Sequence, residues 1–184
     1  DTEGEITRLD AISPTMEAVG RVLTELRGTQ EQVPPMHSAV RIDGQRLYDL
    51  ARQGVEIARD ARRIEVYELD LVSFSIDFLE ISVKCSKGTY VRTLGEEIGK
   101  RLGCGAYLTE LRRTAIGEFR VEDAATPEAL AELGVAAARS RLLPPQALVA
   151  SLPRLDLDEG GAWALCNGQE WQVGAAVGEG EFAL

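Results

Sequence analysis

A change in hydrophobic spacing between residues 79 and 102 constrains the fold of this 184-residue chain more than any other feature. Apolar side chains first alternate, as on a strand with one buried face, at Leu79, Ile81, Val83 and Cys85. They then recur at helical spacing at Val91, Leu94, Ile98 and Leu102. The pattern predicts a strand joined to a helix by a short turn, a junction that offers free backbone N–H groups and can hold side chains at a sheet edge. Lys87, Tyr90 and Arg92 lie at this junction and are candidate site residues, although an ordinary turn with a packed Tyr90 and a solvated Arg92 would give the same pattern.

The remaining chain predicts a mixed set of elements. We expect two antiparallel strands, at 63–72 and 76–85, and a helix at 90–102 that ends at Gly103. An earlier helix is predicted to begin with Ser13 as its N-cap, and later ones at Leu47 and at Thr126–Pro127. Three further segments have weaker patterns: a long loop or small hairpin at 29–46, a strand-like run at 106–119, and short strands with glycine turns at 152–184.

Composition predicts a soluble globular protein with one main core. Apolar residues make up 45% of the chain, and no apolar run approaches the roughly 20 residues that cross a bilayer. The three cysteines, Cys85, Cys104 and Cys166, are far apart and form no C-x-x-C pair typical of a zinc or redox site. We therefore expect a reducing, cytoplasmic location and no membrane partner.

The charge of the chain is unevenly distributed. A net charge of −10 argues against nucleic-acid binding by the molecule as a whole. Residues 84–120, however, contain eight Lys or Arg against four Asp or Glu, and residues 27–63 contain seven against five. Residues 121–184 contain three against ten. A local basic face on an acidic body is the resulting expectation.

Four stretches, in this order and spacing, resemble the TruB-type tRNA pseudouridine synthases. They are residues 27–40 (RGTQEQVPPMHSAV), 47–54 (LYDLARQG), 85–94 (CSKGTYVRTL) and 102–114 (LGCGAYLTELRRT). The resemblance extends over residues 1 to about 135. It implies isomerisation of a uridine in the T-loop of tRNA by an aspartate nucleophile after the base is flipped out of its stack.

The resemblance also implies a fold and its partners. The expected fold class is α+β, a mixed, mostly antiparallel sheet with flanking helices, present here in incomplete form. Residues 1–150 would form the catalytic domain, with an RNA-gripping insertion at about 29–54, and residues 151–184 an incomplete, β-rich, PUA-like subdomain. The implied partner is the T-stem-loop of tRNA, with no obligate protein partner, a monomeric state, and neither a metal nor an organic cofactor.

Site residues follow from the matching positions. Tyr90 would support the flipped uracil by stacking, and Arg92 would pair with the nucleophilic aspartate and keep it ionised. Leu111 would form an apolar wall of the uracil pocket. Lys87, Arg112 and Arg113 would contact phosphates, which position RNA without reading its sequence.

One part of the family pattern has no match in this chain. No segment resembles the loop that carries the nucleophilic aspartate, and residues 1–6 (DTEGEI) resemble a stretch that follows the first third of family members. We therefore expect a chain that begins in mid-fold and is inactive alone. Two alternatives stay open: a noncatalytic RNA-binding or tRNA-folding protein on the same scaffold, and a catalytic subunit guided by small RNAs.

Overall fold

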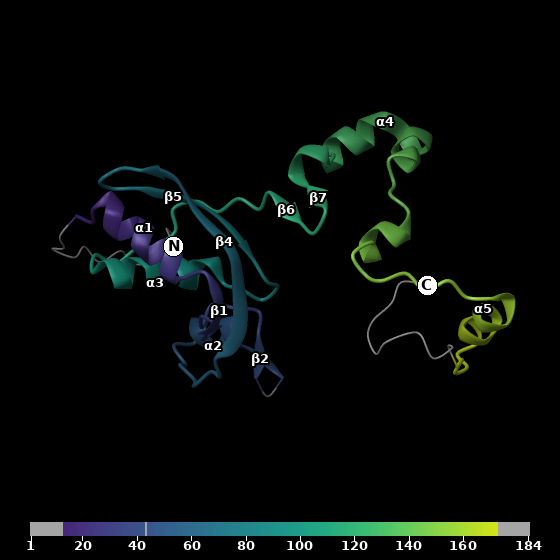
Figure 1. Cartoon of the computed structure of the whole chain (residues 1–184), viewed down its shortest axis with the longest axis horizontal. Helices are drawn as coiled ribbons and strands as arrows, with labels where there is room; N and C mark the ends of the chain where they lie inside the picture. The colour runs from purple at the N-terminus through teal and green to yellow at the C-terminus, as the bar shows by residue number, and fades with distance from the viewer. Residues whose placement is uncertain (1–12, 43, 173–184) are drawn as a thin grey trace. The chain divides into compact units, whose positions relative to one another are not determined.

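A computed structural model describes residues 13–42 and 44–172 (Figure 1). The chain divides into two compact units, residues 1–112 and residues 113–184, which are described separately below. In the described ranges, no helix is both long and apolar enough to cross a membrane.

The centre of the first unit is a three-stranded antiparallel sheet in the order β1-β4-β5. β4 (Arg62–Phe74) lies in the middle and pairs with β1 (Gly28–Gln32) on one side and β5 (Leu79–Cys85) on the other. Figure 1 shows β4 and β5 as a long curved hairpin. Two register shifts interrupt their pairing, between Val66 and Glu68 and between Leu71 and Ser73, and irregularities of this kind increase local twist.

Two helices, α1 (Met16–Glu25) and α3 (Val91–Leu102), pack against each other, and α1 also contacts β4 (Figure 1). Arg101 of α3 joins the helices through an ion pair with Glu25 of α1, at 3.6 Å, and also pairs with Glu97 of its own helix, at 2.8 Å. Together the two helices and β4 form the hydrophobic core, made of Val19, Val22, Leu23, Leu26, Ile64, Val66, Leu69, Leu94 and Ile98. Burying a leucine or valine side chain contributes about 1.5–3 kcal/mol, so this core fixes the helices on the sheet.

A small finger, residues 38–54, leaves this body. It consists of a hairpin of β2 (Arg41–Ile42) and β3 (Gln45–Arg46), followed by α2 (Leu47–Arg52). Hydrogen bonds from the backbone of Leu47 to Val40 and from Tyr48 to Ser38 close it at its base. Leu47 is fully buried, so a single leucine anchors the finger.

The second unit contains short elements. They are the hairpin of β6 (Ala115–Ile116) and β7 (Phe119–Arg120), the 3₁₀ turns η1 (Val121–Asp123) and η2 (Pro145–Val149), and the helices α4 (Pro127–Ser140) and α5 (Glu159–Cys166). α4 is kinked at Gly134, whose φ of +74° is a conformation that glycine adopts readily. An open, mainly apolar groove of about 930 Å³ lies between α4, η2 and β7, and none of the predicted site residues lines it.

Several sequence predictions are confirmed. The strands β4 and β5, the helices α2 and α3, the left-handed Gly103 after α3 and the Thr126 cap of α4 lie where the pattern placed them. The mixed α and β composition with antiparallel sheets is also confirmed. The domain boundary predicted at residue 150 stays a prediction, and the compact units meet at residues 112 and 113.

Other predictions are wrong. The cap of α1 is Thr15, whose hydroxyl accepts a hydrogen bond from the N–H of Ala18, and not Ser13. Residues 28–32 form a strand of the main sheet and not part of a loop. The run 106–119 is mostly irregular, with only the short β6 and part of β7. Residues 159–166 are helical where short strands were expected, and residues 173–184 lie outside the described residues.

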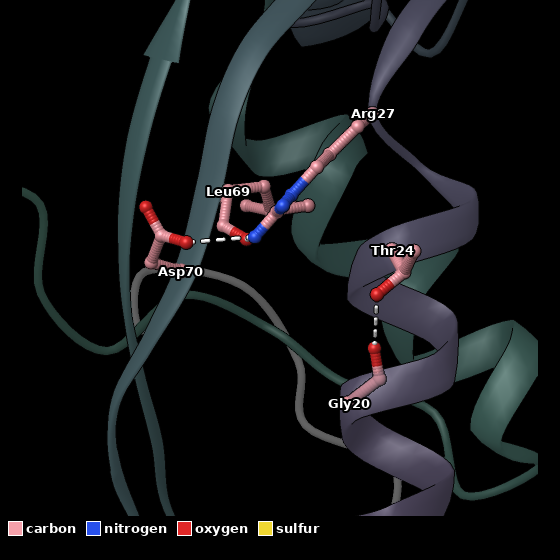
Figure 2. A network of polar contacts seen from close by, with 5 residues as sticks. All are labelled: Gly20, Thr24, Arg27, Leu69 and Asp70. Carbon is pink, nitrogen blue, oxygen red and sulfur yellow. Dashed lines mark hydrogen bonds and ion pairs between the residues drawn. The ribbon is translucent and has the colours of Figure 1, made fainter.

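Arg27 connects the end of α1 to the central strand (Figure 2). Its guanidinium donates to the carbonyl oxygen of Leu69 from Nε at 3.3 Å and from Nη2 at 2.9 Å, and Nη2 also donates to Asp70 at 2.7 Å. Since β1 pairs with β4 only as far as Val66, the arginine side chain continues the hydrogen bonding of β4 beyond the end of β1.

We predict that Arg27→Met lowers the free energy of unfolding by about 1 kcal/mol. The loss is modest because the ion pair with Asp70 is half exposed, and water can replace part of it. Arg21→Met, at an exposed position of α1, is the matched control and should change stability by less than about 0.5 kcal/mol. Urea denaturation measures both, and equal effects would contradict a specific role for Arg27.

Candidate active site

The junction between β5 and α3 is a tight turn held by Ser86. The Ser86 N–H donates to the carbonyl oxygen of Glu65 at 2.8 Å, and the Ser86 hydroxyl accepts from the Glu65 N–H at 3.0 Å. These bonds extend the pairing of β4 with β5 by one residue. The chain then reverses through Gly88, with φ of +84°, and Lys87 is exposed at the tip. The turn therefore presents Lys87 to solvent and delivers Tyr90 to the start of α3.

The backbone of Tyr90 is held by the side chain of Gln32. The Tyr90 N–H donates to Oε1 of Gln32 at 2.7 Å, and Nε2 of Gln32 donates to the Tyr90 carbonyl oxygen at 3.1 Å. That carbonyl also accepts the first helical hydrogen bond of α3, from the Leu94 N–H. Gln32 is only 8% exposed, whereas Tyr90 is half-buried, so a buried amide fixes the backbone from which the tyrosine side chain extends.

Arg92 makes a second hydrogen bond between α3 and the segment that follows β1. Its guanidinium donates to the carbonyl oxygen of His37 at 2.7 Å. Arg92 lies in the first turn of α3 and is half-buried. Charge-assisted hydrogen bonds are about twice as strong as neutral ones, so this contact restrains the arginine. The imidazole of His37 is exposed, and only the backbone of this residue takes part.

The loop after α3 lies against a glycine face of the helix. A Cβ at Gly99 would approach the backbone N of Ala106 and the carbonyl carbon of Gly105 to 2.3 Å, and one at Gly95 would lie 3.3 Å from the side chain of Leu108. Gly95 and Gly99 are buried and one helical turn apart. This close approach sets the path of the loop that carries Leu111 and Arg112.

The structure brings some of the predicted site residues together. Lys87, Tyr90 and Arg92 share the junction, as the sequence predicted. Leu111 and Arg112 are exposed on the loop after α3, with Leu111 65% exposed, so a strand position for Leu111 is wrong. Arg113 is exposed and belongs to the second unit.

Sequence reasoning missed Gln32 and the His37 carbonyl. Gln32 ends β1 in a segment interpreted as a loop, and a buried glutamine has no hydrophobic signal that would reveal its burial. The one available signal is the Pro34–Pro35 pair, which ends a strand because proline cannot donate a ladder hydrogen bond.

The described ranges contain no group of three or more His, Cys, Asp or Glu residues placed to hold a metal ion. The reactive groups of the junction are the phenol of Tyr90, the guanidinium of Arg92 and the ammonium of Lys87, at one sheet edge. Such a set suits stacking on a base and contact with anionic groups.

Comparison with protein families shows to which family the chain belongs. Residues 1–91 match the model described as TruB family pseudouridylate synthase (N terminal domain), and residues 92–150 match the tRNA pseudouridylate synthase B C-terminal domain. The two matches adjoin inside α3, just after Tyr90. The chain belongs to the TruB family.

Similar curated proteins support the same family. The chain is 47% identical over 171 residues to the tRNA pseudouridine synthase B of Azoarcus sp. (strain BH72), which covers 92% of this chain and 57% of the relative. It is 45% identical to the protein of the same name from Aromatoleum aromaticum, over 92% of this chain and 55% of that one, and 41% identical to that from Nitrosococcus oceani, over 100% and 61%. The chain thus spans little more than half the length of these relatives.

A solved structure has the same fold. It is described as the crystal structure of a Cbf5-Nop10-Gar1 complex, and the matched chain superposes with a TM-score of 0.69 at 24% identity. The superposition covers 91% of this chain and 46% of that one. At this identity the likeness concerns the fold alone.

We predict that Gly99→Ala destabilises the first unit by about 1–3 kcal/mol, because the new methyl group must displace backbone atoms of residues 105 and 106. Gly20→Ala is the matched control, since Gly20 is also helical and a Cβ there meets nothing within 4 Å. It should stabilise the protein by about 0.5–1 kcal/mol. Chemical denaturation of both variants gives the comparison, and a neutral Gly99→Ala would contradict the close approach.

Proposed function

We propose that this chain is part of a tRNA pseudouridine synthase that isomerises a uridine of the T-loop. The observation that carries this proposal is the pair of consecutive TruB family matches over residues 1–150, together with relatives named tRNA pseudouridine synthase B. The noncatalytic alternative is not favoured by these relatives. The partner we propose is the T-stem-loop of tRNA, met by a monomeric, cytoplasmic protein.

Tyr90 is proposed to receive the flipped base. Its backbone is fixed by two hydrogen bonds while the residue as a whole is only half-buried, so we expect its side chain to meet a base without a change of backbone. Stacking on an aromatic side chain contributes roughly 1–3 kcal/mol per base, which offsets part of the cost of removing the uridine from its stack. Leu111 is proposed to add an apolar wall beside the base.

Arg92 is proposed to orient the carboxylate that attacks the uridine. A guanidinium within about 4–6 Å of an aspartate favours its ionised, nucleophilic form. The hydrogen bond to the His37 carbonyl restrains the arginine, so less conformational entropy is lost when it meets the carboxylate. In the absence of that carboxylate, these residues would bind RNA without turnover.

The phosphate contacts are proposed to come from two places. Lys87 lies in the junction, Arg112 lies on the loop after α3, and Arg113 follows it in sequence; all three are exposed. In the finger, Arg41 and Arg46 are direct partners on the β2–β3 hairpin, and both line an open, polar hollow of about 420 Å³. Like charges directly opposite on a hairpin repel each other, and a phosphate between them would relieve that repulsion.

The end of the chain is proposed to belong to a small PUA-like subdomain, residues 151–184. The support is the resemblance of its sequence, from Leu155 to Gly168. α5, capped by Asp158, packs its Gly160–Gly161 pair against Trp171.

We predict that Tyr90→Ala reduces turnover at least about 100-fold in the complete gene product, while the dissociation constant for a T-stem-loop RNA rises less than about tenfold, because the phosphate contacts remain. Pseudouridine formation is measured by carbodiimide labelling and primer extension. Tyr67→Ala, at a half-exposed tyrosine of β4, is the matched control and should keep normal turnover. A wild-type protein that forms no pseudouridine would contradict the proposed function.

Arg112→Ala tests a phosphate contact separately. We expect weaker RNA binding and a decrease of about one in the slope of log K against log salt concentration, with little change in kcat at saturating RNA. Arg21→Ala, on the exposed side of α1, provides the control. Titrations at several salt concentrations measure the slope, and an unchanged slope would remove Arg112 from the interface.

A further inference from the structure

We propose that Gln32 is a positioning residue, whose side-chain carboxamide sets the orientation of Tyr90 and, through the first turn of α3, of Arg92. This inference rests on the proposed function. It assigns a role in the reaction to a buried residue of β1 that acts through the backbone of Tyr90.

The sheet brings Gln32 to the junction. β1 and β5 are both antiparallel to β4, so they run in the same direction on either side of it. Their last residues, Gln32 and Cys85, therefore both lie towards the beginning of β4, where their partners are Arg62 and Val66. The turn that follows β5 then leads Tyr90 to the end of β1.

The carboxamide matches the backbone of Tyr90 at both positions. Oε1 accepts from the Tyr90 N–H at 2.7 Å, and Nε2 donates to the Tyr90 carbonyl oxygen at 3.1 Å. One side chain therefore provides both bonds that a neighbouring strand would provide. A carboxylate lacks the donor and a lysine lacks the acceptor, so neither could make both of the bonds that the Gln32 amide makes here.

The position of Tyr90 makes this contact consequential. Tyr90 is the N-cap residue of α3, and its own side chain makes no capping hydrogen bond. The Gln32 contact replaces local capping as the restraint on the helix start. Five residues beyond Gln32, the His37 carbonyl accepts from Arg92, so one segment restrains the backbone of Tyr90 and the side chain of Arg92.

Gln30 offers a matched control on the same strand. Its Nε2 donates to the carbonyl oxygen of Leu26 at 2.8 Å, so it also bonds a backbone group, but at the end of α1. Gln30→Met and Gln32→Met remove the same chemical group from strand positions two residues apart. Only the second should affect the reaction.

The test compares Gln32→Met, Gln32→Glu and Gln30→Met in the complete gene product, with T-stem-loop RNA as substrate and rates normalised to the folded fraction. We expect kcat to fall about 100-fold for both Gln32 variants, since displacements of about 1 Å can cost this much, while KM changes less than about threefold. Gln30→Met should keep kcat within about twofold of the wild type. In the 184-residue chain, the amide of Tyr90 should exchange its hydrogen at least about tenfold faster after Gln32→Met.

Each of these results supports or overturns the role of Gln32. A wild-type kcat in a folded Gln32→Met variant, or unchanged exchange at the Tyr90 amide, would overturn the role of Gln32. If Gln32→Met does not fold, the Gln32→Glu variant decides, because it keeps the size and the acceptor while losing the donor. An equal fall in kcat for Gln30→Met would mean that any change in the side chains of β1 disturbs the reaction, and it would also overturn the inference. An inactive wild-type protein would instead refute the proposed function, and the exchange measurement would still report on the contact.

Discussion

The burial of one face of β4 is the constraint on which the first unit depends. Ile64, Val66 and Leu69 are buried in one cluster with side chains of α1 and α3, so the register of β4 cannot slip by one residue without exposing the core. This register fixes β1 and β5 in the same direction on its two sides. The ends of these two strands, and the residues that follow them, therefore lie at one edge of the sheet, which is the candidate site.

Close packing then determines where α3 leads. The helix begins at a residue held by Gln32 and ends at Gly103 in the left-handed conformation. Between these points, Gly95 and Gly99 let the following loop cross the helix at backbone contact distance. The start of α3 and the loop after it are thus both fixed relative to the same helix axis. This arrangement lets residues as separated in sequence as Tyr90 and Arg112 be held by a single element.

The sequence predicted the elements with strong periodicity and missed those held by polar contacts. The alternation of β5 and the helical spacing of α3 result from burial on one face, and both elements were placed correctly. β1 (GTQEQ) has no such alternation of apolar residues, because its contribution to the fold is backbone pairing with β4. Tyr90 and Arg92 could be predicted as site residues from their motif. Gln32 could not, since only the folded chain brings residues 32 and 90 together.

The same polar contacts link the junction to the finger. The segment that starts at Gln32 meets Tyr90, then Arg92 through His37, and its next residue, Ser38, accepts a hydrogen bond from the backbone of Tyr48 in α2. Within α2, the guanidinium of Arg52 lies 4.6 Å from the centre of the Tyr48 ring, which restrains both side chains. Residues 32–38 join the junction to the β2–β3 hairpin, which carries Arg41 and Arg46. RNA that moved the finger would therefore also move the segment that positions Tyr90 and Arg92. In the proposed function, binding of the T-stem-loop and placement of the uridine would therefore be mechanically connected through residues 32–38.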